Sequence, residues 1–98
     1  RTIAADELWL SGNYGRDGIA LHFTWKPQQQ EVETILPHVE SALAPFAARP
    51  HWGKLFTARA TELEKLYPKF DDFIELVQRL DPAGKFRNEF LDRNLFGV

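Results

Sequence analysis

The sequence has 98 residues, 44% of them hydrophobic and 27% charged, which predicts one modest soluble domain. A formal net charge of −2, without any block of like charges, argues against a nucleic-acid-binding surface. The chain contains no cysteine, which excludes disulfides and thiolate metal sites, and it shows neither a membrane-spanning run nor a signal peptide.

The chain begins at Arg1, directly inside a patterned segment, and it contains no methionine. We therefore expect it to be the C-terminal piece of a longer protein. We also expect that protein to be cytoplasmic.

The first elements are short. Residues 1–4 alternate polar and apolar side chains, as a strand does. Residues 6–10 are compatible with a further strand or with a helical turn. Residues 11–18 contain three glycines together with Asn13 and Asp17, a composition typical of a loop.

Residues 19–26 give the clearest strand pattern. Every second residue from Ile19 to Trp25 is apolar and forms one predicted face, which we assign to the core. The opposite face carries His22 and Thr24. From the pattern alone, this second face is either an ordinary solvent-facing side or part of a binding site.

A helix is predicted over residues 28–46, because apolar residues recur there at three- and four-residue spacing. Pro37 lies inside this pattern, so we expect a kink or a restart. The polar face, which includes Glu40, is interpreted as solvated, and His38 as an exposed helix residue.

The second half of the chain is mainly helical. Residues 50–54 are assigned to a strand or its edge, and Thr57 is expected to cap a short helix that ends near Leu66. An amphipathic helix follows from about Phe70 to Leu80, then a turn at residues 81–84, and Asn88 is expected to cap a last short helix. The order predicts an α+β fold, with helices packed on a small antiparallel or mixed sheet.

Several kinds of site do not fit the sequence. The three histidines at positions 22, 38 and 51 lack the spacing of a metal site. Ser11 and Ser41 lie outside any nucleophile elbow, and the glycine-rich loop lacks a phosphate-binding pattern.

Residues 49–54, Arg-Pro-His-Trp-Gly-Lys, gather an imidazole, an indole and an amine. Residue types alone favour a structural interpretation: Trp52 in the core, Lys54 solvated and His51 bonded to backbone. Against this, Gly53 in a strand would indicate close approach of another backbone or a ligand. A lysine held there could donate hydrogen bonds to a substrate hydroxyl or a developing anion.

These residues resemble a known family. The 49–54 stretch, the Leu-His-Phe-Thr-Trp strand at 21–25 and the Asp-Pro-Ala-Gly-Lys-Phe-Arg-Asn-Glu-Phe-Leu tail at 81–91 are similar to the C-terminal part of FAD-linked alditol oxidases. That family includes xylitol and sorbitol oxidases. It is related to the sugar-1,4-lactone oxidases of the vanillyl-alcohol oxidase superfamily, and the resemblance runs along essentially the whole chain.

The resemblance implies roles for five residues. Lys54 and Arg1 would be catalytic and would bind substrate, with Thr24 and His22 lining the same polyol site. His51 would approach the FAD. The family's glutamate two residues before that arginine would fall upstream of Arg1, and the FAD-binding domain would also lie outside this sequence. Residues 1–98 would then be part of the substrate (cap) domain plus C-terminal helices.

The implied reaction is oxidation of a polyol's terminal hydroxyl by O₂, giving H₂O₂, with FAD bound mainly by the chain's own FAD-binding domain. This fragment alone would be inactive. The alternatives are a fragment of a sugar-1,4-lactone oxidase of the D-arabinono-1,4-lactone type, or a stand-alone carbohydrate-binding α+β module. A fragment without its partner domain would expose apolar area around Trp9, Trp52 and Phe90, so we also expect self-association.

Overall fold

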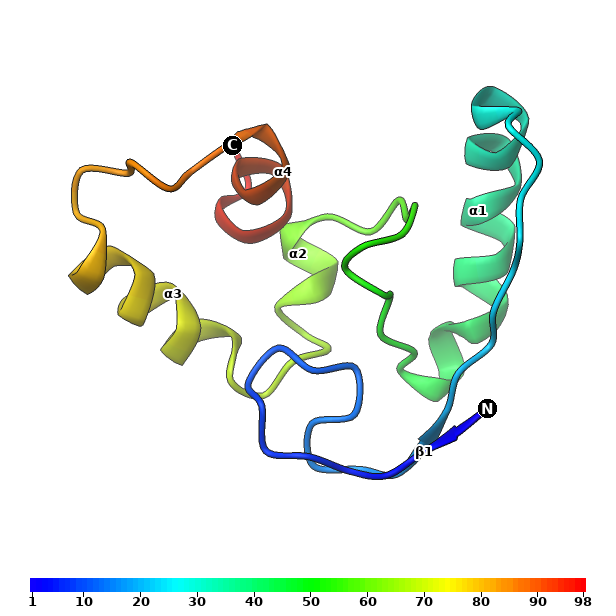
Figure 1. Ribbon diagram of the computed structural model, residues 1–98, viewed down its shortest axis with the longest axis horizontal. Coiled ribbons are helices and arrows are strands. Elements are labelled where there is room, and N and C mark those ends of the chain that lie inside the picture. Colours follow the sequence, from blue (N-terminus) through cyan, green and yellow to red (C-terminus); the bar gives the residue numbers. More distant parts are fainter. The chain divides into compact units, whose positions relative to one another are not determined.

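The computed structural model describes all residues from Arg1 to Val98, and they form two compact units (Figure 1). The N-terminal unit, Arg1–Thr57, contains β1 (Thr2–Ile3), β2 (Gly18–Ile19), α1 (Gln29–Leu43) and the 3₁₀ turn η1 (Ala44–Phe46). The C-terminal unit, Ala58–Val98, contains α2 (Ala60–Leu63), α3 (Phe70–Leu80), α4 (Glu89–Leu91) and the π-helical turn η2 (Asp92–Phe96). Helices combined with one antiparallel sheet confirm the predicted α+β class.

The sheet has two antiparallel strands, in a register that pairs Thr2 with Ile19 and Ile3 with Gly18. The pairing extends one residue further, because Arg1 and Ala20 exchange hydrogen bonds of 3.1 and 2.8 Å between their backbone groups. The loop predicted at residues 11–18 is confirmed, and Gly15 takes a φ of +70°, which favours glycine. Residues 6–10 form neither a strand nor a helix apart from an isolated bridge at Asp6.

The strand predicted over residues 19–26 is wrong beyond Ile19, because no second strand pairs with the later residues. A strand is stabilised by its hydrogen-bonded neighbour, which an alternating pattern cannot supply by itself. Leu21 and Phe23, assigned to the core, are 61% and 46% exposed. The alternation is still partly present, since the rings of Phe23 and Trp25 stack at 5.3 Å. Because Phe23 and Trp25 point to the same side of the chain, Thr24, which lies between them, points to the opposite side.

The predicted amphipathic helix is confirmed as α1, which buries Val32 and Leu36. It runs through Pro37 without a break, so the chain does not restart there. Glu40 is not merely solvated. Its carboxylate is partly buried and accepts hydrogen bonds from the backbone N–H of Thr57, at 2.7 Å, and from the Thr57 hydroxyl. This contact also overturns the capping role predicted for Thr57.

Arg59 occupies the N-cap position of α2, and the helix ends at Leu63, earlier than predicted. The Glu62 carboxylate accepts a 2.8 Å hydrogen bond from the Arg59 backbone N–H. That bond is the main reason why the pKa of Glu62 is lowered from its ordinary value of 4.5. The exposed Glu62 side chain thus caps the N-terminus of α2, a helix of four residues.

The later elements of the C-terminal unit follow the predictions closely. Phe70 begins α3 and is buried, and Leu80 ends the helix. Asn88 caps α4, with its side-chain oxygen accepting from the Leu91 N–H at 2.9 Å. The main buried apolar side chains of this unit are Ala60, Leu63, Tyr67, Phe70 and Leu95.

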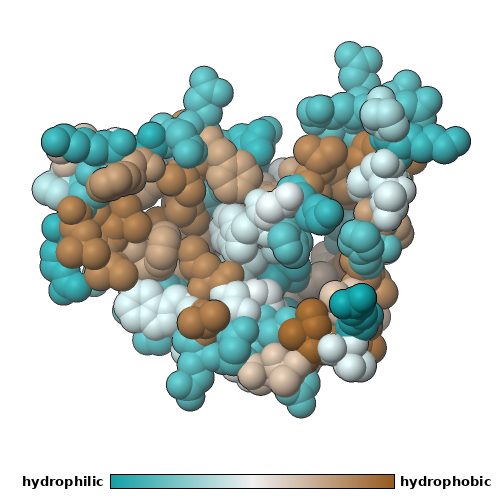
Figure 2. Space-filling model, viewed as in Figure 1, coloured by the Kyte–Doolittle hydropathy of each residue, from teal (hydrophilic) through white to brown (hydrophobic).

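Hydrophobic side chains are visible at several places on the surface in Figure 2. Trp9 and Phe90 are each 37% exposed, as expected, whereas Trp52 is only half-buried rather than exposed. Every helix falls short of the length and apolar character that crossing a bilayer requires.

Candidate functional site

Residues 51–54 form a tight turn, so the prediction of a strand at this position is wrong. The Lys54 N–H donates to the His51 carbonyl at 3.0 Å, and the Gly53 N–H donates to His51 Nδ1 at 3.0 Å. Gly53 therefore serves the turn rather than a close strand approach. A Cβ at residue 53 would lie 3.2 Å from His51 Cε1, so glycine leaves room for the imidazole to fold back over the turn.

Arg49 attaches this turn to the glycine-rich loop. Its Nη1 donates to the Tyr14 carbonyl at 2.9 Å, with longer contacts of 3.4 and 3.5 Å to the Ser11 and Gly12 carbonyls. One guanidinium group thus binds several outward-pointing carbonyls of a loop that has little regular structure. All three contacts come from the same nitrogen, Nη1, of the Arg49 side chain.

Trp52 makes a second attachment to the same loop. Its indole N–H donates to the Leu10 carbonyl at 2.9 Å, and its ring meets Phe56 edge-on at 6.0 Å between centroids. Arg49, which precedes the turn, and Trp52, its second residue, together attach its N-terminal part to residues 10–14. They are positioning residues to which the sequence pattern alone gave no such role.

With the turn held in this way, His51 and Lys54 are exposed. Because His51 Nδ1 accepts a hydrogen bond, the neutral imidazole carries its proton on Nε2. The ring therefore offers an N–H donor, and the exposed Lys54 side chain of the same turn offers the donors of its ammonium group. Such a pair can bind an electron-rich group, such as a flavin edge or a substrate oxygen.

Arg1, His22 and Thr24 lie elsewhere in the same unit, and all three are exposed. The Arg1–Ala20 pairing puts Arg1 opposite a residue only two positions before His22. Paired residues of an antiparallel ladder project to the same side. Arg1 and Ala20 therefore belong to one face, and His22 and Thr24 would join it only if the alternation continued through residues 21–24, which form no strand. No hydrogen bond or ion pair joins this group to His51 or Lys54.

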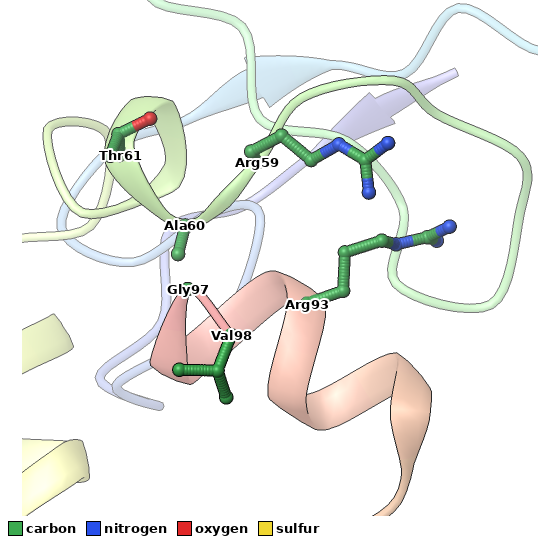
Figure 3. Close-up of a pocket in the computed structure, with 6 residues that line it drawn as sticks. All are labelled: Arg59, Ala60, Thr61, Arg93, Gly97 and Val98. Atoms are coloured by element: carbon green, nitrogen blue, oxygen red, sulfur yellow. The ribbon is translucent and has the colours of Figure 1, made fainter.

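The structure contains no group of three His, Asp or Glu side chains able to hold a metal ion. A surface pocket of about 260 Å³ lies within the C-terminal unit (Figure 3). Its lining includes Arg59 and Arg93, whose guanidinium groups extend to the same side. None of the five predicted site residues lines it, since all five belong to the N-terminal unit.

A family model described as D-arabinono-1,4-lactone oxidase matches residues 1–94. An alditol oxidase of Streptomyces sp. is 50% identical over 91 residues, which cover 93% of this chain and 22% of that protein. An L-gulono-1,4-lactone dehydrogenase of Mycobacterium tuberculosis is 38% identical over 97 residues, which cover 97% of this chain and 22% of that protein. An L-gulonolactone oxidase of Scyliorhinus torazame is 31% identical over 99 residues, which cover 98% of this chain and 22% of that protein. The chain thus spans about a fifth of the length of these relatives.

Proposed function

We propose that this chain, which belongs to the D-arabinono-1,4-lactone oxidase family, forms the substrate-binding wall of an FAD-dependent alditol oxidase. The observation that carries the proposal is the anchored turn at residues 51–54. The fold uses Arg49, Trp52, Gly53 and the Nδ1 atom of His51 to hold this turn, yet the Nε2 side of the His51 ring and the Lys54 amine are left for another purpose, since both residues are exposed.

Lys54 and Arg1 would donate hydrogen bonds to the substrate oxygens. Their positive charge would stabilise the negative charge that grows on a hydroxyl oxygen as it loses its proton. Thr24 and His22 would bind further hydroxyls of the polyol and so orient its terminal carbon.

The chemistry of His51 fits a flavin neighbour, because its Nε2–H is a donor fixed by the Gly53 hydrogen bond. When bound, FAD would accept a hydride from the terminal carbon and pass the two electrons to O₂, giving H₂O₂. The part of this chain would be to bind and orient the substrate and to donate hydrogen bonds.

We rank an alditol above a lactone as the candidate substrate. The Streptomyces alditol oxidase is 50% identical to this chain, whereas the lactone dehydrogenase is 38% identical. A sugar-1,4-lactone is the second candidate, since lactone-oxidising relatives align over almost the whole chain. A stand-alone carbohydrate-binding module is the alternative from another class, and a parent gene without an upstream flavin domain would support it.

Steady-state oxidation by the full-length protein tests the proposal, with xylitol, sorbitol and a 1,4-lactone as substrates. Lys54→Ala should lower kcat/KM for the polyols by about 100-fold or more, the usual effect of losing one donor to a developing anion. Lys65→Ala, which removes an exposed lysine of the C-terminal unit, is the matched control and should have no effect. Faster turnover of the lactone than of both polyols would favour the second candidate.

A further inference from the structure

Glu40 lies in the last turn of α1, where the helix dipole disfavours a negative charge. It is nevertheless partly buried, and its two carboxylate oxygens both accept hydrogen bonds from one residue, Thr57. One oxygen accepts from the Thr57 backbone N–H at 2.7 Å, and the other accepts from the Thr57 hydroxyl. The helix therefore does not favour an acid at position 40, and the contact with Thr57 is the observation that accounts for it.

Thr57 follows Lys54 by three residues, in a stretch of chain that forms no helix or strand. On the N-terminal side of Lys54, the Trp52 indole N–H donates to the Leu10 carbonyl at 2.9 Å. On the C-terminal side, Glu40 binds both the backbone and the hydroxyl of Thr57. The chain that carries Lys54 is thus attached to the segment before the glycine-rich loop on one side and to α1 on the other.

Three features of the Glu40–Thr57 contact suit it to fixing the position of the chain. Hydrogen bonds to a carboxylate are about twice as strong as those between neutral groups. One of the two donors is a backbone N–H, so the bond restrains the main chain itself and not only the Thr57 side chain. Glu40 is carried by a regular helix of 15 residues, which is a more rigid base than a loop. The contact therefore holds the main chain three residues after Lys54.

We propose that Glu40 is a positioning residue, which holds Lys54 in its working place by binding Thr57. The inference rests on the proposed function, because that function supplies the task of Lys54. Misplacing a catalytic group by about 1 Å can lower a rate by about 100-fold. Glu40 itself would touch neither substrate nor flavin, so its whole effect on the reaction should pass through Lys54.

A double-mutant cycle in the full-length protein tests this dependence. Glu40→Ala is made in the wild type and in Lys54→Ala, and flavin reduction by xylitol is followed in a single turnover. The rate constant then describes molecules that are folded and hold flavin, whereas a loss of folded protein lowers the amplitude. Glu40→Ala should slow the reduction by about 10-fold or more in the wild type, and by about 2-fold at most in Lys54→Ala. Equal slowing in both backgrounds, or none in either, would overturn the proposal.

Three further variants separate the Thr57 contact from a general effect on the helix. Glu33→Ala is the matched control, because it removes an exposed carboxylate of α1 that bonds to Gln29 of the same helix, and it should leave the rate unchanged. Thr57→Val removes the hydroxyl but keeps the backbone N–H, so it should slow the reduction less than Glu40→Ala. Glu40→Gln keeps an acceptor oxygen and should retain most of the rate. A Glu40→Gln variant as slow as Glu40→Ala would overturn the role given to these hydrogen bonds.

Amide hydrogen exchange distinguishes a failure of this inference from a failure of the proposed function. The Lys54 N–H donates to the His51 carbonyl, so its exchange reports whether the turn stays closed, without any assay of oxidation. In Glu40→Ala this amide should exchange about 10-fold faster or more, although both of its bonded atoms are unchanged. Unchanged exchange would overturn the proposal whatever Lys54 does in catalysis. A wild-type rate of flavin reduction in Lys54→Ala would instead refute the task of Lys54, while faster exchange in Glu40→Ala would still show that Glu40 holds the turn.

Discussion

The two units of this chain are stabilised by different means. The C-terminal unit buries apolar side chains such as Leu63, at 0% exposure, and Tyr67, at 1%. In the N-terminal unit only Val32 and Leu36 are buried, and hydrogen bonds from side chains to backbone connect its loops. All five proposed site residues belong to the N-terminal unit. The proposed site residues thus belong to the unit that depends more on polar contacts than on a core of its own.

The family motifs of the two units differ in the same way. In the tail at 81–91, the Asp81 carboxylate accepts hydrogen bonds from the N–H groups of Lys85 and Phe86, at 2.8 and 2.9 Å. Gly84 takes a φ of +67°, and Asn88 caps α4. The fold therefore explains the main residues of that motif. In the 49–54 motif the fold explains Arg49, Trp52 and Gly53, but it requires neither the amine of Lys54 nor the Nε2–H of His51.

Leu63→Ala should have the largest effect on stability, because it removes a fully buried side chain from the C-terminal unit. We expect a loss of about 2–5 kcal/mol in the free energy of unfolding. All three tryptophans lie in the N-terminal unit, so tryptophan fluorescence reports on that unit and circular dichroism on the helices of both. A fluorescence transition that shifts as much as the dichroism transition would show that the units unfold as one.

Arg49→Ala should affect the N-terminal unit alone. Hydrogen bonds from a charged donor contribute about 1.5–3 kcal/mol, so the contact to Tyr14 should be the main loss. Amide hydrogen exchange of residues 11–14 measures this loss, and the exchange of these amides should become about 10-fold faster or more. Arg49→Lys keeps the charge and a single donor nitrogen on a differently shaped side chain, and it should restore only part of the protection. Full protection in Arg49→Lys would mean that charge, not geometry, holds the loop.

Asn88→Ala should destabilise the C-terminal unit by about 1 kcal/mol, the usual contribution of an N-cap side chain. Asn88→Asp retains an acceptor for the Leu91 N–H and is the control. Chemical denaturation followed by circular dichroism compares the variants. If Asn88→Asp were as unstable as Asn88→Ala, the cap would not be the reason for the loss.

The smallest expected effect is the pH dependence of the stability that Glu62 contributes. The folded pKa of this carboxyl is lowered below 4.5 by the Arg59 N–H. Its stabilising contribution is present above 4.5 and disappears as the pH falls through the lower folded value. The thermal midpoint of Glu62→Gln should therefore lie below that of the wild type at neutral pH and approach it in acid. A difference that stays constant with pH would exclude this hydrogen bond as its source.

What the sequence predicted correctly depends on short-range rules. α3, the 81–84 turn and the Asn88 cap are set by residues within a few positions of one another, and all three are confirmed. The two main errors involve distant partners. Residues 21–26 lack the neighbouring strand that their pattern requires, and Glu40 contacts Thr57, 17 residues away. Such pairings are decided by tertiary contact, which periodicity does not report.

The site shows the same division. The alternation that puts Thr24 opposite Phe23 and Trp25 follows from strand geometry and is supported by the stacked rings. The attachment of the 51–54 turn by Arg49 could not be predicted, because it depends on a carbonyl 35 residues earlier in the chain. The roles given to Arg1, His22, Thr24, His51 and Lys54 stay predictions that rest on the family resemblance.

We propose that the exposed side chains of the 51–54 turn, His51 and Lys54, serve catalysis rather than folding. Anaerobic mixing of the full-length protein with xylitol, followed by flavin absorbance, tests it most directly, with Lys65→Ala as control. For Lys54→Ala the account predicts a rate of flavin reduction lower by about 100-fold or more, with unchanged thermal stability. A reduction rate equal to that of the wild type in Lys54→Ala would contradict the account.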